Sequence, residues 1–278
     1  MLSALATGAF GAVYRGRSLA TDRPVAIKFS LVAEGSARLR FEREAQLLSR
    51  IVHPNVVRLL DFGGATSDAP GSSRDADELY AVLVMELVDG VTLSQLLAAR
   101  GGTLPWPDAA KIVLATLEGL DAAHDAGVLH RDVKPQNILI EPNGDVPKLV
   151  DFGIARATDD DFARVTEDGA MLGSLAYMSP EQLAIEPVDA RTDVYAAGIV
   201  LYELLSGTLP FEGAGMKIAV DKLDSAGPIA MKRPASGARW PDTLTDLVLA
   251  MLRRDPAERP ASAALVVEEL RTLLARGK

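Results

Sequence analysis

Hydrophobic and polar positions divide the chain into an early part with the two-residue period of strands and a later part with the period of helices. Residues 11–16 and 23–30 are short runs rich in β-branched and aromatic side chains, and the polar stretch between them predicts a β-hairpin. Residues 36–51 show helical spacing, and residues 79–87 predict a buried strand. From Thr92 onwards helical patterns dominate, so we expect a small strand-rich lobe followed by a larger helical lobe.

The boundary between the two lobes is expected near Val88, and residues 63–78 have the composition of a surface loop.

Composition and charge exclude several classes of protein. The apolar run at residues 194–205 contains Glu203, which predicts a buried helix rather than a membrane span. The net charge of −9 argues against a general nucleic-acid or membrane-surface binder, and the lack of cysteine excludes a disulfide framework. The start of the chain has no basic signal-peptide region, so we expect a soluble, cytoplasmic protein.

Lys28 and Glu44 are the first candidate functional residues. The strand period places Ala26 and Lys28 on one face, where a small side chain beside a lysine could cover a flat ring and reach its phosphates. Taken alone, a lysine in solvent on an edge strand explains Lys28 better. Glu44 lies between Phe41 and Leu48 on the apolar stripe of the following helix. A buried carboxylate needs a cation, for which Lys28 is the natural candidate, and the alternative is that Glu44 reaches water at the rim of the helix contact.

Two apolar runs that flank Asn143 and Gly144 predict a second hairpin. A hairpin folded symmetrically about Gly144 places Asn137 roughly opposite Asp151. An amide oxygen and a carboxylate are ligands that suit Mg²⁺. A hairpin with two polar ends would give the same pattern, so both interpretations stay open here.

Asp132 and Lys134 come just before this hairpin. Such a pair could orient a hydroxyl group and balance the charge on a phosphoryl group during its transfer. The alternative for Asp132 is a loop carboxylate that caps a backbone amide.

Residues 5–16, "LATGAFGAVYRG", have the glycine pattern of a lid over nucleotide phosphates, with Ala6 where the first glycine usually lies. They could form a working phosphate cradle, a decayed one, or an ordinary turn between two strands.

These segments, in this order, resemble the signature set of protein kinases, and most of all the bacterial serine/threonine protein kinases of the eukaryotic-like (Hanks) type. The matching motifs cover almost the whole chain and are "TGAFGAV", "VAIK", "FEREAQLL", "HRDVKPQN", "DFG", "MSPEQ", "DVYAAGIVLYELLSGTLPF" and "DPAERP". The resemblance implies an α+β, two-lobed kinase fold. Residues 1–88 would form an N-lobe of antiparallel strands with one key helix, and residues 89–278 a mostly helical C-lobe.

The resemblance also implies an activity, namely transfer of the γ-phosphate of ATP to Ser/Thr hydroxyls of protein substrates with Mg²⁺. Lys28 would hold the α- and β-phosphates and pair with Glu44. Asp132 would accept or orient the hydroxyl proton, and Lys134 would contact the γ-phosphate. The metal ligands would be Asn137 and Asp151.

For the nucleotide site the resemblance implies a lid, a gatekeeper (Met85), a hinge that reads the base (Glu86 to Val88), and a sandwich around the ring (Val13, Ala26 and Leu139). The full set of nucleotide-binding residues would be Leu5, Ala6, Thr7, Gly8, Ala9, Phe10, Gly11, Ala12, Val13, Ala26, Lys28, Met85, Glu86, Val88 and Leu139.

Ala6 is the main departure from the family pattern. If its backbone is extended, the added methyl group should cost little, and we expect a working lid with somewhat weaker nucleotide binding. An Ala6→Gly change should then lower the Michaelis constant for ATP modestly.

The resemblance also implies roles for residues around the site. Asp193 would prop the catalytic loop from below, and Glu181 and Arg259 would form the ion pair that pins the end of the activation segment. Arg131 would meet a phosphate on residues 155–174, with Thr166 as the first candidate acceptor and Thr158 as the second. Two copies of the chain could come together as a homodimer for this autophosphorylation.

Two other classes of function remain to be separated. A pseudokinase would use the same fold as a binding scaffold, and a small-molecule kinase would share the core chemistry. The presence of Lys28, Glu44, Asp132, Asn137 and Asp151 speaks against the scaffold. The "MSPEQ" segment and the long helix after Asp193 favour a peptide-binding lobe over a small-molecule site.

Overall fold

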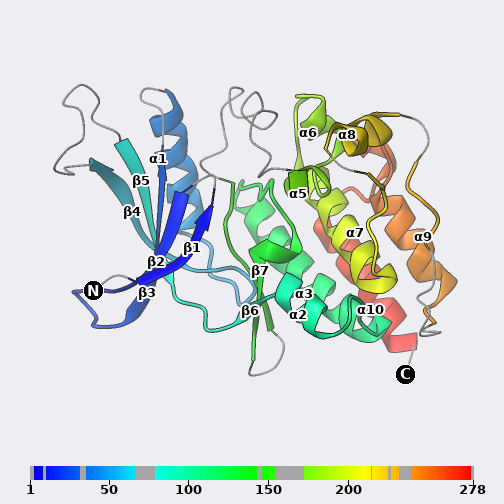
Figure 1. Cartoon of the computed structure of the whole chain (residues 1–278), viewed down its shortest axis with the longest axis horizontal. Coiled ribbons are helices and arrows are strands. Elements are labelled where there is room, and N and C mark those ends of the chain that lie inside the picture. Colours follow the sequence, from blue (N-terminus) through cyan, green and yellow to red (C-terminus); the bar gives the residue numbers. More distant parts are fainter. Residues whose placement is uncertain are drawn as a thin grey trace.

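The first part of the chain forms an antiparallel sheet, shown in blue and teal in Figure 1. The computed structural model describes residues 3–8, 11–31, 36–66, 79–142, 146–153, 172–213, 215–224, 227–231 and 239–276. Within these residues the sheet has the order β1-β2-β3-β5-β4, and its strands are β1 Ser3–Gly8, β2 Gly11–Arg17, β3 Pro24–Leu31, β4 Leu59–Thr66 and β5 Leu79–Glu86. The expected hairpin is β2 and β3, and the expected buried strand is β5.

Helix α1, Ser36–Leu48, packs against β4 and β5 (Figure 1). Its apolar stripe is as expected, because Phe41, Ala45 and Leu48 are all buried. This stripe fixes the rotation of the helix, and the side chain of Glu44 therefore points inward.

The register of the sheet decides which side chains share its inner face. Val13 lies opposite Lys28, and Ala26 lies opposite Met85. Residues that face each other across an antiparallel ladder lie on the same side of the sheet. Val13, Ala26, Lys28 and Met85 therefore line one face, as the alternation in β3 predicted for Ala26 and Lys28.

Strand β4 was not expected from the sequence, and the loop predicted at residues 63–78 is wrong over its first four residues. Residues 63–66 belong to β4 and pair with residues 79–82 of β5. Two consecutive glycines, Gly63 and Gly64, hide the strand, because glycine carries no side chain to show the alternation. The ladder to β5 and the contact with α1 hold this edge strand in place.

The second part of the chain is mostly helical and carries a small sheet of β6 Val91–Thr92, β7 Ile138–Glu141 and β8 Val146–Leu149. Its described α-helices are α2 Leu93–Ala99, α3 Trp106–Asp125, α5 Leu172–Leu175, α6 Pro180–Leu183, α7 Ala190–Ser206, α8 Met216–Leu223, α9 Asp242–Met251 and α10 Ala263–Arg276. Two short 3₁₀ turns, η1 Pro135–Asn137 and η4 Pro256–Glu258, lie between them.

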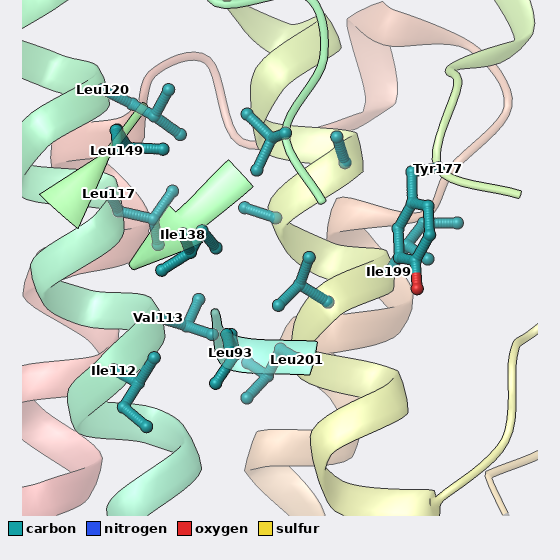
Figure 2. Close-up of a cluster of buried hydrophobic side chains, with 14 of the residues drawn as sticks. Leu93, Ile112, Val113, Leu117, Leu120, Ile138, Leu149, Tyr177, Ile199 and Leu201 are labelled. Atoms are coloured by element: carbon teal, nitrogen blue, oxygen red, sulfur yellow. The ribbon is translucent and has the colours of Figure 1, made fainter. Parts of the chain in front are cut away.

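Helix α7 forms the centre of this lobe, with α3 and α9 packed against it. It is buried at every position from Thr192 to Tyr202, which confirms the buried helix expected there. Figure 2 shows the core between α3 and α7, where Leu117, Ile138 and Leu201 from three different elements meet. Among the described residues, no helix combines the length and the hydropathy needed to cross a bilayer.

Candidate active site

Asp193 anchors the loop between α3 and β7 to the centre of the helical lobe. Its carboxylate accepts hydrogen bonds from the backbone N–H groups of His130 (2.9 Å) and Arg131 (2.8 Å). It also lies 2.8 Å from the imidazole Nε2 of His124. Burial alone would raise the pKa of Asp193, but the interactions with His124 and His130 together outweigh burial and hold the pKa below its usual value. The loop is therefore fixed through its backbone, and the side chains of the residues after Arg131 do not take part in this anchor.

Asp132 and Lys134 lie together on this loop, as the sequence suggested. The ammonium of Lys134 is 2.9 Å and 3.2 Å from the two carboxylate oxygens of Asp132. The amide nitrogen of Asn137 donates to Asp132 Oδ2 at 2.9 Å. Lys134 also donates to the hydroxyl of Ser174 at 3.1 Å, so it connects the loop to a second segment. These donors orient the carboxylate of Asp132.

Lys28 crosses from the sheet to the helical lobe and forms an ion pair with Asp151, with 3.1 Å between Nζ and Oδ1. Asp151 has a φ of 59° and Arg131 a φ of 61°, both in the left-handed region that non-glycine residues rarely adopt. Two such residues at one site are a sign that the surrounding contacts impose this backbone.

His130 supplies several of those contacts. Its backbone carbonyl accepts from Gly153 N–H at 3.0 Å, and its ring Nε2 lies 2.9 Å from the Val150 carbonyl. The ring also packs on Phe152, with 4.5 Å between ring centroids. Burial lowers the pKa of His130, so the imidazole is neutral when it bridges these groups. His130 thus contacts the residues that precede and follow Asp151 in the chain and holds them in place.

The expected pair of Lys28 with Glu44 is not formed, and the structure corrects it. Glu44 Oε1 instead accepts from Arg131 Nη1 at 3.1 Å. The apolar stripe of α1 turns Glu44 inward, as predicted, and burial raises the pKa of its carboxyl against the opposing effect of Arg131. The sequence pattern of α1 gives the direction of Glu44 but not the cation that it meets, which is Arg131 from the loop between α3 and β7.

Asn137 and Asp151 come close, but their register differs from the predicted one. The ladder of β7 and β8 pairs Ile138 with Leu149, so Asn137 lies opposite Val150 rather than Asp151. The backbone carbonyl of Asn137 accepts from Val150 N–H at 3.0 Å. The ladder is centred half a residue before Gly144, and Asn143 and Gly144 themselves lie outside the described residues.

The donor set of these two residues fits a hard cation. Both side-chain hydrogen bonds of Asn137 use its amide nitrogen, which leaves the amide oxygen as a ligand. Asp151 adds a carboxylate of which one oxygen contacts Lys28. Amide and carboxylate oxygens are what Mg²⁺ prefers.

The lid residues fall into three groups. Leu5, Ala6, Thr7 and Gly8 end β1, Gly11 to Val13 begin β2, and Ala9 and Phe10 lie outside the described residues. Ala6 pairs with Val13 and is not among the non-glycine residues with positive φ. The condition for tolerating alanine there is therefore met, while the effect of Ala6 on nucleotide binding stays a prediction.

The expected hinge begins at Glu86, the last residue of β5, and is tied to the helical lobe. Glu86 Oε1 contacts Lys148 Nζ on β8 at 2.9 Å and accepts from Arg58 N–H at 3.1 Å. Met85 is buried in the sheet, and Val88 packs against the core. Leu139 is half-buried on β7, between the fully buried Ile138 and Ile140, so it faces away from the core of the helical lobe.

Glu181 and Arg259 form the expected ion pair. The two guanidinium nitrogens Nη1 and Nη2 lie 2.8 Å from the two carboxylate oxygens, and both side chains are almost fully buried. Thr192 Oγ1 donates to the same carboxylate at 2.7 Å. This bidentate pair joins the start of α6 to the segment before α10.

Sequence reasoning missed one feature near the site, namely Lys222, a buried lysine on α8. Lys222 lies in none of the motifs, and a lysine in an amphipathic helix gives no signal of burial. The candidate phosphorylation sites Thr158 and Thr166 lie outside the described residues.

Comparison with known proteins agrees with this geometry. The model of the protein kinase domain family matches residues 1–270. The chain is 38% identical over 276 residues to serine/threonine-protein kinase pkn2 of Myxococcus xanthus, covering 97% of this chain and 32% of that protein. It is 38% identical over 275 residues to serine/threonine-protein kinase PknL of Mycobacterium tuberculosis, covering 97% of this chain and 64% of that protein. The chain thus spans about one to two thirds of the length of these curated relatives.

A solved structure is similar over its whole length. The crystal structure of the Mycobacterium tuberculosis PknI kinase domain superposes with a TM-score of 0.71 at 26% sequence identity, covering 97% of this chain and 94% of that one. The bacterial serine/threonine kinase resemblance and the two-lobed fold expected from the motifs are confirmed. The chain belongs to the protein kinase domain family.

Proposed function

We propose that this chain is a serine/threonine protein kinase that transfers the γ-phosphoryl group of ATP to Ser/Thr hydroxyls of protein substrates. One observation carries the proposal: two neighbouring sets of contacts bring together a carboxylate for the hydroxyl, cations for the phosphates and oxygen ligands for a metal. One set is Lys28 with Asp151, and the other is Asp132 with Lys134 and Asn137. The backbone hydrogen bond from Val150 N–H to the Asn137 carbonyl holds the two sets next to each other.

In the proposed reaction the substrate hydroxyl oxygen forms a bond to the γ-phosphorus while the bond to the β–γ bridging oxygen breaks. The hydroxyl proton passes to the carboxylate of Asp132, and ADP leaves with the bridging oxygen. Lys134, held beside Asp132, balances the negative charge of the phosphoryl group in transfer.

The amide oxygen of Asn137 and the carboxylate of Asp151 would hold Mg²⁺. When bound, the metal neutralises the charge that accumulates on the phosphate oxygens. Lys28, which contacts Asp151 from β3, would bind the phosphates on the other side of the site. Glu44 contributes by holding Arg131 of the catalytic loop.

For the nucleotide we propose a site between an N-lobe of residues 1–88 and a C-lobe of residues 89–278. The sheet face with Val13, Ala26 and Met85 would cover one side of the base, and Leu139 would cover the other. The lid from Leu5 to Ala12 would close over the phosphates, and the backbone of Glu86 to Val88 would read the edge of the base.

Replacing the proposed proton acceptor tests this function. We expect Asp132→Asn to lower the rate of phosphate transfer from ATP to a generic basic protein by about 10²-fold or more, because an amide cannot take the proton. The matched control is Asp125→Asn at the exposed end of α3. Equal transfer by both variants would reject the mechanism, and transfer to choline or an aminoglycoside but not to protein would favour a small-molecule kinase.

We also propose that two copies of the chain phosphorylate each other at Thr166 or Thr158. Arg131, which lies next to Asp132 and pairs with Glu44, is the cation available to a phosphate on that segment. Mass spectrometry after incubation with Mg²⁺ and ATP checks this. Phosphate found only outside residues 156–174 would reject it.

A further inference from the structure

The segment from Ser174 to Met178 lies directly beside the proposed catalytic loop. The hydroxyl of Ser174 contacts Lys134, which in turn contacts Asp132. A peptide that brings its hydroxyl to Asp132 must therefore pass along this segment. Its position decides where the peptide backbone can lie.

The four residues that follow Ser174 have buried side chains. Leu175, Ala176, Tyr177 and Met178 are all buried. The Tyr177 hydroxyl donates to Glu203 Oε2 on α7 at 2.6 Å, and burial raises the pKa of Glu203. Inward-turned side chains bring part of the backbone inward as well, and buried carbonyl groups need hydrogen-bond donors. Beyond the short helix α5, regular secondary structure does not supply those donors.

One lysine supplies them. Lys222 lies on α8, beside α6 (Figure 1), and is 2% exposed. Its Nζ donates to the carbonyls of Leu175 (3.1 Å), Ala176 (2.7 Å) and Met178 (2.7 Å). An ammonium group has three N–H donors, and here each one has a carbonyl partner.

The surroundings show that Lys222 is not held by a counter-ion. Within the described residues no carboxylate lies at ion-pair distance from it, and its ammonium lies over the aromatic rings of Tyr195 (5.4 Å to the centroid) and Phe211 (5.6 Å). Burial lowers its pKa well below the usual lysine value. A hydrophobic side chain would fill this position at lower cost if filling were its role. The three carbonyls are what require a lysine.

We propose that Lys222 is a positioning residue for the protein substrate: it clamps the backbone of residues 175–178 and so sets how a peptide presents its hydroxyl to Asp132. The inference rests on the proposed protein kinase function and adds a residue on α8, a helix outside every motif that the sequence offered. Lys222 does not touch the reacting atoms. Its effect passes through the segment that it holds.

The test compares two lysines on the same helix. Lys222→Met removes the three donors, and Lys217→Met, at an exposed position one and a half turns earlier, is the matched control. Both are assayed with a serine-containing peptide selected by screening a peptide library against the wild-type chain. We expect Lys222→Met to lower kcat/KM for the peptide by about tenfold or more, since misplacement by about 1 Å is enough for such a loss. The KM for ATP and the slow hydrolysis of ATP by water should stay within about twofold of wild type.

A second readout does not depend on activity. Hydrogen–deuterium exchange of the amides in residues 172–179 should become faster in Lys222→Met and stay unchanged in Lys217→Met. If Lys222→Met does not fold, Lys222→Gln replaces it, because the amide keeps two N–H donors and should give an intermediate loss.

Three results would overturn the inference. They are equal losses for peptide and ATP, no loss relative to Lys217→Met, and failure of both Lys222 variants to fold, which would make the lysine a general support of the lobe. A wild-type chain that folds and binds ATP but phosphorylates no peptide would instead reject the proposed function, and the inference with it.

Discussion

Gly11 and Ala6 belong to the same lid but meet different steric demands. At Gly11 φ is 130°, and a Cβ atom would lie 1.9 Å from the carbonyl oxygen of Phe29 on the neighbouring strand. At Ala6 the backbone is that of a β-strand opposite Val13. The sequence shows which lid glycine is missing, and the backbone shows why the chain can do without it.

Replacing Gly11 should therefore be costly. We expect Gly11→Ala to lower the free energy of unfolding by about 2 kcal/mol or more, because both the φ angle and the contact with β3 resist a side chain. Gly63→Ala on β4 is the control, since a Cβ there meets nothing within 4 Å. Urea denaturation of both variants checks this, and equal stability of the two would contradict it.

Which residues lie at the candidate site could be predicted from the sequence better than which of them contact each other. The two-residue period of β3 placed Ala26 and Lys28 on one face, and the stripe of α1 turned Glu44 inward, as the structure has them. The partner of Glu44 could not be predicted, because a periodic pattern gives the direction of a side chain and not what lies there. Arg131 reaches Glu44 from the loop between α3 and β7, which is distant in the sequence.

At the level of elements, one buried ion pair joins α6 to the chain that leads into α10. Arg259 holds Glu181 with two hydrogen bonds and also donates to the backbone carbonyls of Arg191, Arg253 and Arg254. Helix α6 is only one turn long and cannot be stable by itself. Its position depends on this pair and on its capping box at Ser179.

Breaking the pair from one side should leave a buried charge without a partner. We expect Glu181→Gln to lower the free energy of unfolding by about 3 kcal/mol, since the guanidinium of Arg259 stays in the interior. Glu186→Gln, three residues beyond the end of α6 and exposed, should change it by about 0.5 kcal/mol or less. Calorimetry on both variants checks this, and a neutral Glu181→Gln would show that the pair is dispensable.

The ion pair of Glu181 and Arg259 should make the free energy of unfolding depend on pH, and the direction follows from the pKa of Glu181. Burial would raise the pKa of Glu181, but its hydrogen bonds with Arg259 and Thr192 lower it below the ordinary value of 4.5. The unfolded chain then binds its proton first as pH falls, so the stabilisation by Glu181 is complete above pH 4.5 and is lost below it. The difference in unfolding free energy between wild type and Glu181→Gln should shrink as pH drops from 6 to about 3. A difference that grows over this range would contradict the sign.

Elements were predicted where their periodicity is strong. The hairpin of β2 and β3, helix α1 and the buried helix α7 follow from side-chain spacing, because each buries one side or all of its surface. Strand β4 did not, since its two glycines erase the alternation and only the ladder to β5 defines it. The register of β7 on β8 was one residue off, because a turn signal gives the place of a turn and not its length.

At the level of the whole molecule, three ion pairs between described residues join the first, strand-rich part of the chain to the helical part. They are Lys28 with Asp151, Glu44 with Arg131, and Glu86 with Lys148. Two of them end on the proposed catalytic machinery and the third on the proposed hinge. Side chains that would meet the nucleotide therefore also help to hold the two parts together.

A bound nucleotide with Mg²⁺ should therefore raise the free energy of unfolding of the whole molecule, with Asp151 as a proposed ligand of the metal. At a concentration about 100 times its dissociation constant, a non-hydrolysable ATP analogue with Mg²⁺ should add about 2.7 kcal/mol to the free energy of unfolding. Asp151→Asn should remove most of the Mg²⁺-dependent part, and Asp125→Asn should keep it. Thermal melting with and without Mg²⁺ checks this, and full stabilisation of Asp151→Asn would place the metal elsewhere.

The attachment of the proposed catalytic loop to α7 by Asp193 has a consequence for behaviour on heating. Releasing the loop would take two backbone donors from a carboxylate inside a helix that is buried at every position from Thr192 to Tyr202, so local loosening is unfavourable. Turnover should survive warming until the helical lobe itself melts. The loss of turnover and the calorimetric transition should then trace one curve rather than two.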